Sequence, residues 1–404
     1  QIISTQPACT LTLSAAGDHD LLLSVENEDG RSSEQLTLRV VSRLDGEIYM
    51  ADEYNVPLGR TLLLDATLWH YAAPSYLWQC GAEQSTDPVF RFTPSTEGEY
   101  SIMLTITDSD GYSLTRTLNV VCTPTEGTFR REVSAESRAT ATKVYEYRPA
   151  AGQFINEPQS GFAGEQTADA AVAYAQKRLE GEKYVSLGGW GGYVVVGFDH
   201  SVVNSGDYDF SIAGNMHEGS SEAGIVWVMQ DANGNGLPDD VWYELRGSEW
   251  GTENHSRGYA ITYYRPAAAG MGVQWRDNRG ATGTLRRNAT HTQEFYYPAW
   301  EESSFTLYGS RLEANTEVDP TTGNQVNRAY AWGYADNQGS DSDTGSAGEA
   351  VRNYFKISSA VAADGSAVDL QYIDFVKVQS AINFVAGALG EISTEVLAIR
   401  DENM

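Results

Sequence analysis

Short runs in which apolar and polar residues alternate recur along the whole chain, and clusters of turn-forming residues separate them. Residues 35–40 and 116–121 both alternate with a period of two, and each run follows an Asp-Gly pair. Such alternation beside an Asp-Gly turn is typical of an antiparallel β-hairpin. Residues 7–41 and 88–122 also align without a gap at an offset of 81 residues (88 − 7). We therefore expect two copies of one β-structured repeat.

The C-terminal part of the chain shows the same pattern over a greater length. Short apolar runs typical of strands stand at residues 193–198, 209–213, 225–229, 241–245, 259–264, 304–308, 354–357 and 372–378. Residues 167–180 differ, because Ala168, Val172 and Leu179 recur at helical spacing after Thr167, a residue type that caps helices. Many short strands with frequent turns predict a sandwich or jelly roll with one short helix.

These patterns divide the chain into four segments. Residues 1–41 correspond to an incomplete repeat, residues 42–122 to a complete β-sandwich, and residues 145–404 to a larger domain. Residues 123–144 are rich in polar and small residues and have no apolar period, so we expect a linker there. The predicted fold class is all-β.

The composition excludes some classes of partner. The net charge is −28, from 55 acidic residues and 27 Lys or Arg. Nucleic acids and anionic membranes are bound through clustered positive charge, which this composition opposes. No apolar run reaches the roughly 18 residues that a membrane helix needs. Of the three Cys, Cys80 and Cys122 fall in one predicted domain and could pair.

The sequence gives little support to catalysis. It contains no Gly-x-Ser-x-Gly elbow, no His-Glu-x-x-His motif and no phosphate-binding loop before a helix. Glu222 and Glu244 could form a glycosidase pair if the fold placed them at the right separation. We predict a protein that is not an enzyme and uses no organic cofactor.

The sharpest local motif is an acidic loop at residues 231–240. Oxygen-bearing side chains occupy its positions 1, 3, 5 and 9, with Gly at position 6, as in the first part of an EF-hand loop. Position 12 is Trp242 instead of the bidentate Glu, so a hairpin turn without an ion is the alternative. The candidate ligands of a structural Ca²⁺ ion are Asp231, Asn233, Asn235, Asp239 and Asp240. Residues 336–343 form a second acidic loop with less regular spacing.

Aromatic residues gather in the turn-rich segments of the large domain. Flat aromatic faces bind sugar rings or a corrin macrocycle through apolar contact, whereas packing in the core is the alternative for each ring. The candidate ligand contacts are Trp250, Trp275, Tyr296, Tyr297, Trp300, Trp332 and Tyr334.

Several motifs of residues 42–122 occur in an order that is found in a known family. They are Gly59, Tyr76-Leu77-Trp78, Phe90-Arg91-Phe92, Gly98-Glu99-Tyr100 and residues 108–111. On these motifs the segment resembles the PKD-like family of immunoglobulin-type domains. The resemblance implies a β-sandwich that serves as a spacer, with Trp78 in its core, and a first repeat that lacks its front half.

The large domain contains a second dense set of motifs. They include residues 188–193, Gly197-Phe198-Asp199-His200, residues 208–210 with Gly214-Asn215, Ser221-Glu222, residues 242–248 and residues 389–396. On these motifs, residues 145–401 resemble the C-terminal domain of Bacteroidetes surface lipoproteins, some of which bind vitamin B12. The resemblance implies a jelly-roll sandwich similar to carbohydrate-binding modules, a lipid anchor upstream of Gln1 and a location on the outer face of the outer membrane.

The sequence leaves several functions open. The first hypothesis is a monomeric lipoprotein that captures cobalamin for an outer-membrane, TonB-dependent transporter. The alternative is a carbohydrate-binding surface protein of a glycan-utilisation system. A purely adhesive protein and a glycoside hydrolase are the remaining possibilities.

Overall fold

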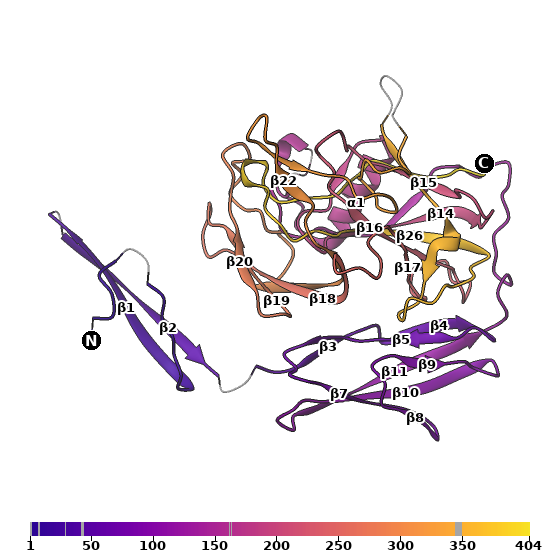
Figure 1. Cartoon of the computed structure of the whole chain (residues 1–404), viewed down its shortest axis with the longest axis horizontal. Helices are drawn as coiled ribbons and strands as arrows, with labels where there is room; N and C mark the ends of the chain where they lie inside the picture. Colours follow the sequence, from indigo (N-terminus) through magenta and orange to yellow (C-terminus); the bar gives the residue numbers. More distant parts are fainter. Residues whose placement is uncertain are drawn as a thin grey trace. The chain divides into compact units, whose positions relative to one another are not determined.

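The structure is a computed structural model, and it describes all residues except 1, 7–8, 29, 42–43, 161, 163 and 344–349. The described chain forms two compact units, Gln1–Glu47 and Ile48–Met404. Strands dominate both units, and one α-helix occurs among the described residues (Figure 1). The predicted all-β fold class is therefore confirmed.

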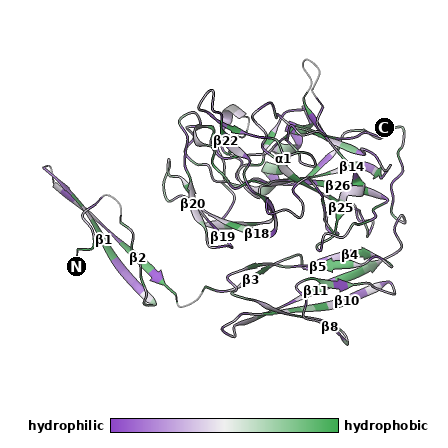
Figure 2. Cartoon of the chain, viewed as in Figure 1, coloured by the Kyte–Doolittle hydropathy of each residue, from purple (hydrophilic) through white to green (hydrophobic). Residues whose placement is uncertain are grey.

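The N-terminal unit contains one hairpin, made of β1 (Gly17–Asn27) and β2 (Gly30–Val40). The strands pair antiparallel from Gly17 and Val40 to the turn. Both strands contain polar and apolar stretches (Figure 2), with alternation over residues 35–40 of β2, and most of their side chains are exposed. The second copy of the repeat forms the equivalent hairpin, as the sequence predicts.

The next sandwich has an immunoglobulin-like arrangement. Its strands are β3 (Glu47–Tyr49), β4 (Glu53–Pro57), β5 (Leu62–Leu64), β6 (Thr67–Trp69), β7 (Ser75–Cys80), β8 (Glu83–Ser85), β9 (Phe90–Phe92), β10 (Gly98–Thr107) and β11 (Ser113–Thr123). One sheet has the order β4-β11-β10-β7-β8, while β5 pairs with β9 and β3 with β6. Trp78 is fully buried against Phe90, so its expected core position is confirmed.

The two cysteines of this sandwich are not paired. Cys80 ends β7 and Cys122 lies near the end of β11, and β10 separates these strands in the sheet. Both thiols are free. The possible Cys80–Cys122 disulfide is therefore absent, because strand order, which the sequence does not reveal, keeps the two strands apart.

The large domain is a β-sandwich with additional sheets. Its strands are β12 (Lys143–Arg148), β13 (Val185–Ser186), β14 (Tyr193–Val203), β15 (Phe210–Ala213), β16 (Gly224–Met229), β17 (Tyr243–Leu245), β18 (His255–Tyr264), β19 (Val273–Asp277), β20 (Thr282–Leu285), β21 (Ser304–Leu312), β22 (Thr316–Val318), β23 (Gln325–Asn327), β24 (Arg352–Phe355), β25 (Ala360–Val361), β26 (Tyr372–Ser380), β27 (Glu395–Val396) and β28 (Ala398–Asp401). A six-stranded sheet, β12-β14-β26-β16-β17-β25, and a three-stranded sheet, β24-β15-β28, enclose the main core. A four-stranded sheet, β20-β19-β18-β21, covers a second core.

Helix α1 (Ala168–Glu180) begins where the sequence predicts. The Thr167 side chain accepts a hydrogen bond from the backbone N–H of Ala170 at 3.1 Å, which satisfies one free donor of the first turn. Three short 3₁₀ helices, η1 (Pro158–Ser160), η2 (Ile357–Ser359) and η3 (Gly387–Leu389), complete the described elements. Among the described residues, no helix has both the length and the apolar character needed to cross a membrane.

The segment predicted as a linker, 123–144, packs on the large domain. Arg131 forms an ion pair with the buried Asp374 of β26 at 2.8 Å and donates to the carbonyl oxygen of Phe198. Asp374 also accepts hydrogen bonds from Ser201 Oγ and from the backbone N–H of Asp231. A segment without apolar periodicity is thus held by charge and backbone hydrogen bonds, which leave no periodic signal in the sequence.

Candidate functional site

Three of the predicted ligand-contacting rings lie in the core. Tyr296 and Tyr297 are 1% exposed and Tyr334 is 2% exposed. Tyr296 Oη donates to the carbonyl oxygen of His291, and Tyr297 Oη donates to that of Glu302. Tyr334 Oη accepts from the backbone N–H of Glu249. These three rings have no free face for a ligand, which corrects the prediction for them; each hydroxyl instead finds the partner that a buried Tyr needs.

The four predicted Trp residues lie at separate places. Trp250 packs beside His255, with ring centroids 4.5 Å apart, and Trp300 packs on the main core. Trp275 packs on the second core. Trp332 is 41% exposed and lines a pocket together with Tyr208 and Lys356. The structure does not bring these four rings into one site.

The acidic loop at residues 231–240 lies between β16 and β17, as predicted, and closes on itself. Its Asn side chains accept hydrogen bonds from backbone N–H groups and donate through their amide nitrogens to Asp239. Asp231 Oδ2 accepts from the N–H of Gly236, and Asp240 Oδ2 accepts from that of Ala232. The other oxygens of Asp231 and Asp240 are buried without a partner. Two free carboxylate oxygens are compatible with Ca²⁺, but the other side chains are already satisfied within the loop, so the Ca²⁺ assignment stays a prediction.

A different set of aromatic rings surrounds a cavity of about 190 Å³. Trp227 on β16 and Lys377 on β26 are direct cross-strand partners in the six-stranded sheet, and Trp227 also pairs with Glu244 of β17. Directly paired residues project from the same face of a sheet. This face is the one turned away from the main core, which contains Val376 and Val378 on either side of Lys377.

Lys377 holds its ammonium nitrogen among aromatic rings. The nitrogen lies 4.7 Å from the ring centroid of Trp227, 5.0 Å from that of Trp242 and 5.9 Å from that of Tyr193. Burial lowers the pKa of Lys377 to about 8, although the carboxylates of Glu146 and Glu244 favour its charged form. A cation so placed is stabilised by the faces of the rings and remains able to donate hydrogen bonds.

The rim of the cavity combines apolar rings with polar groups. Tyr308 is 46% exposed and stacks on Tyr49, with ring centroids 5.6 Å apart. Arg257, Asp65 and Ser310 also line the cavity. We call this site the Lys377 pocket, defined by Trp227, Trp242, Lys377, Tyr308 and Arg257. It can hold a small ligand through ring contacts and orient it through charged and hydroxyl groups.

Sequence reasoning missed the Lys377 pocket for a physical reason. Trp227 lies in the middle of an apolar run and Lys377 lies within another run that also contains Asp374, so both suggest ordinary strand positions. The available signal was that single Lys in the run 372–378, because a charge in a buried strand requires a local explanation. The strand order that brings the two residues together is a tertiary property.

The two carboxylates proposed as a glycosidase pair have different surroundings. Glu244 Oε1 is 2.7 Å from His255 Nε2, and Glu244 Oε2 accepts from Ser310 Oγ at 2.5 Å. Glu222 instead lies close to Asp336 and Glu395. Glu244 and Glu222 thus have separate sets of partners, and the structure does not support a role for them as a catalytic pair.

Comparisons with known proteins do not assign the chain to a family. No family model matches it, and no curated protein matches it. Among solved structures, it is similar to tandem immunoglobulin domains of titin, with 15% identity over 26% of this chain and 63% of that chain and a TM-score of 0.16. The match thus spans less than two thirds of the titin chain.

Two further structures match over most of the chain. A carbohydrate-binding module of the β-sandwich superfamily has 12% identity, covering 89% of this chain and 99% of that one, with a TM-score of 0.17. A SusE-like protein has 6% identity, covering 88% and 96%, with a TM-score of 0.17. Similarity at this level identifies neither a family nor a ligand, so the function must be argued from the residues of this chain.

Proposed function

We propose that this chain is a non-catalytic binding protein of the bacterial cell surface and that the Lys377 pocket captures a carbohydrate. The observation that supports the proposal is the cavity itself, in which Trp227 and Trp242 flank the ammonium group of Lys377 and Tyr308 lines the rim. Aromatic faces cover the apolar face of a sugar ring, while an ammonium group donates hydrogen bonds to its oxygens.

The size of the cavity favours a sugar over cobalamin. A volume of about 190 Å³ has room for roughly a dozen water molecules, which is comparable with one or two sugar rings. A corrin macrocycle with its side chains is far larger and would have to lie mostly outside. Cobalamin therefore becomes the rival ligand, and delivery to a TonB-dependent transporter in the outer membrane remains part of the proposal.

The test is isothermal titration of the full chain with soluble oligosaccharides chosen from a glycan array, and in parallel with cyanocobalamin. We expect a glycan to bind and the Trp242→Ala variant to lose at least tenfold in affinity, because stacking on that ring is removed. Trp332→Ala, which changes an exposed ring outside the pocket, is the matched control and should bind normally.

Two results would contradict the proposal. Glycan binding that survives Trp242→Ala would place the site elsewhere on the chain. Saturable binding of cyanocobalamin together with no binding on the array would replace the carbohydrate with cobalamin as the ligand.

A further inference from the structure

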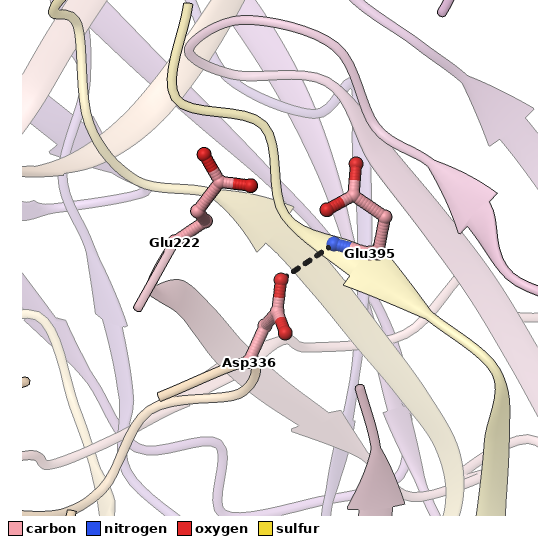
Figure 3. Close-up of side chains that lie close together, drawn as sticks. All are labelled: Glu222, Asp336 and Glu395. Atoms are coloured by element: carbon pink, nitrogen blue, oxygen red, sulfur yellow. Dashed lines mark hydrogen bonds between the residues drawn. The ribbon is translucent and has the colours of Figure 1, made fainter. Parts of the chain in front are cut away.

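Three carboxylates from distant parts of the sequence meet in the large domain. Glu222 precedes β16, Asp336 lies in the second acidic loop, and Glu395 begins β27. One oxygen from each carboxylate lies within 4.8 Å of the others, and the close-up view shows them side by side (Figure 3). Asp336 is fully buried, Glu395 is 1% exposed, and Glu222 is half-buried.

Backbone hydrogen bonds hold the three segments in register. The N–H of Glu395 donates to Asp336 Oδ2 at 2.9 Å, and the N–H of Glu222 donates to the backbone carbonyl oxygen of Asp336 at 2.9 Å. Gly214 leaves space for the acid, because a Cβ there would lie 2.5 Å from Asp336 Oδ1. The carboxylates are therefore positioned by the fold and do not meet as flexible surface groups.

The charges at this place are not balanced within the cluster. The charged neighbours that act on Glu395 are Glu222 and Asp336, which are both acids. Burial and the charges of Asp336 and Glu391 raise the pKa of Glu222 to about 8, and burial raises that of Asp336 to about 7. The site would hold like charges together at neutral pH unless it binds protons or a cation.

A buried oxygen that lacks a partner points to a cation. Glu395 Oε1 is buried and accepts no hydrogen bond. The neighbouring hydroxyls of Ser186 and Ser393 bond to each other at 2.6 Å. A buried acceptor without a donor is costly, and a bound cation would remove that cost.

The side chain of Asn215 lies beside the cluster. Its amide nitrogen lies 3.2 Å from Asp336 Oδ1 and 3.3 Å from Glu395 Oε2 and donates to both. Asn215 is exposed, so water can reach the cluster from this side.

We propose that Glu222, Asp336 and Glu395 bind a Ca²⁺ ion. All three donors are hard oxygen ligands, which suit Ca²⁺ or Mg²⁺ and not a transition metal. Three carboxylates in one site favour Ca²⁺, because Ca²⁺ takes many protein oxygen ligands whereas Mg²⁺ keeps several waters and is usually bound through one or two carboxylates. The site is distinct from the loop at residues 231–240, and it does not depend on the Lys377 pocket.

The first experiment is Ca²⁺ titration of the full chain after treatment with a chelator, followed by calorimetry and by thermal unfolding. We expect binding with a Kd of about 10⁻⁴ to 10⁻³ M, as in extracellular modules, and a rise in Tm of about 2–5 °C at 10 mM Ca²⁺. Mg²⁺ at the same concentration should produce no comparable rise. Glu222→Gln, which keeps the shape and removes the charge, should weaken binding at least tenfold.

Two variants make the outcome specific. Asp231→Asn, in the other acidic loop, should leave this binding unchanged. Asn215→Asp alters a solvent-exposed residue and should strengthen Ca²⁺ binding while lowering the Tm in chelator, because it replaces the amide donor with an oxygen ligand and adds a negative charge. A lower Tm for Asn215→Asp both with and without Ca²⁺ would overturn the proposal.

Two further results would also refute the site. The first is a wild-type chain that neither binds Ca²⁺ nor gains stability from it. The second is binding that Asp231→Asn abolishes and Glu222→Gln leaves intact, because the ion would then belong to the other loop. An equal rise in Tm with Mg²⁺ would contradict the assignment to Ca²⁺.

Discussion

The ammonium nitrogen of Lys377 lies 4.7 Å from the ring centroid of Trp227, and the two residues are direct partners on adjacent strands. The Lys side chain is therefore held at the centre of a sheet face by its own backbone pairing as well as by its neighbours. A binding group fixed in this way loses little conformational entropy when a ligand arrives.

Replacing Lys377 with Met should change how stability depends on pH. The folded pKa of about 8 lies below the usual value near 10.4, so the folded chain binds fewer protons than the unfolded chain between these values. The Lys therefore destabilises the fold below pH 8, and this penalty disappears as the pH rises to about 10.4. We expect Lys377→Met to raise the free energy of unfolding at pH 7 by roughly 1–3 kcal/mol. Urea denaturation of the wild type and of Lys377→Met at pH 7 and pH 9.5 measures the difference in the free energy of unfolding. We expect a smaller difference at pH 9.5, and an equal difference at the two pH values would contradict this explanation.

The carboxylate cluster should make the chelator-treated protein less stable as the pH rises. The pKa values of Glu222 and Asp336 are raised to about 8 and about 7, so the folded state binds more protons than the unfolded state above pH 4.5. The contribution of these groups to the free energy of unfolding thus falls between about pH 4.5 and 8. Urea denaturation of the wild type and of Glu222→Gln in chelator gives the free energy of unfolding at each pH. We expect this free energy to fall less steeply with pH for the variant, and parallel curves would count against this explanation.

Arg131→Met should destabilise the protein strongly. The substitution leaves the fully buried Asp374 without its cationic partner, and losing one member of such a pair costs about 3–5 kcal/mol. Arg130→Met is the matched control, because Arg130 pairs with the exposed Glu132, and it should cost less than about 1 kcal/mol. Urea denaturation of the wild type and of both variants measures these losses in the free energy of unfolding. Equal losses in the two variants would show that segment 123–144 is not held as the structure implies.

Trp78→Ala should test the core of the immunoglobulin-like sandwich. The ring is fully buried and stacks on Phe90 at 5.6 Å, so its removal leaves a large cavity. We expect a loss of about 3–5 kcal/mol in the free energy of unfolding. The same change at Trp332, which is 41% exposed, should cost about 0.5 kcal/mol or less. A small effect at Trp78 would mean that this sandwich unfolds separately from the measured transition.

Features that depend on neighbours in sequence could be predicted. The apolar run at residues 225–229 marks β16, and Thr167 marks the start of α1, because capping and short apolar runs are patterns of a few neighbouring residues. His200, within the motif at residues 197–200, lies buried between Asp199 and Asp401. These signals are local, so one chain is enough to read them.

The candidate sites depend on contacts that the sequence does not show. Asp336 and Glu395 belong to separate motifs, and only the folded chain brings them beside Glu222. Tyr296 and Tyr297 illustrate the converse, because a turn-rich segment suggested exposure whereas the second core covers both rings. Burial of a side chain is decided by the elements that pack over it, and these lie elsewhere in the chain.

The three acids of the cluster also join late parts of the chain to early ones. Glu222 is fixed before β16, whereas Glu395 begins β27, 173 residues later in the sequence (395 − 222). An ion bound there requires the last strands to be in place, so a chain that has not finished folding cannot hold it. Occupancy of the cluster would thus mark molecules in which these segments are packed together, and it would slow their local separation.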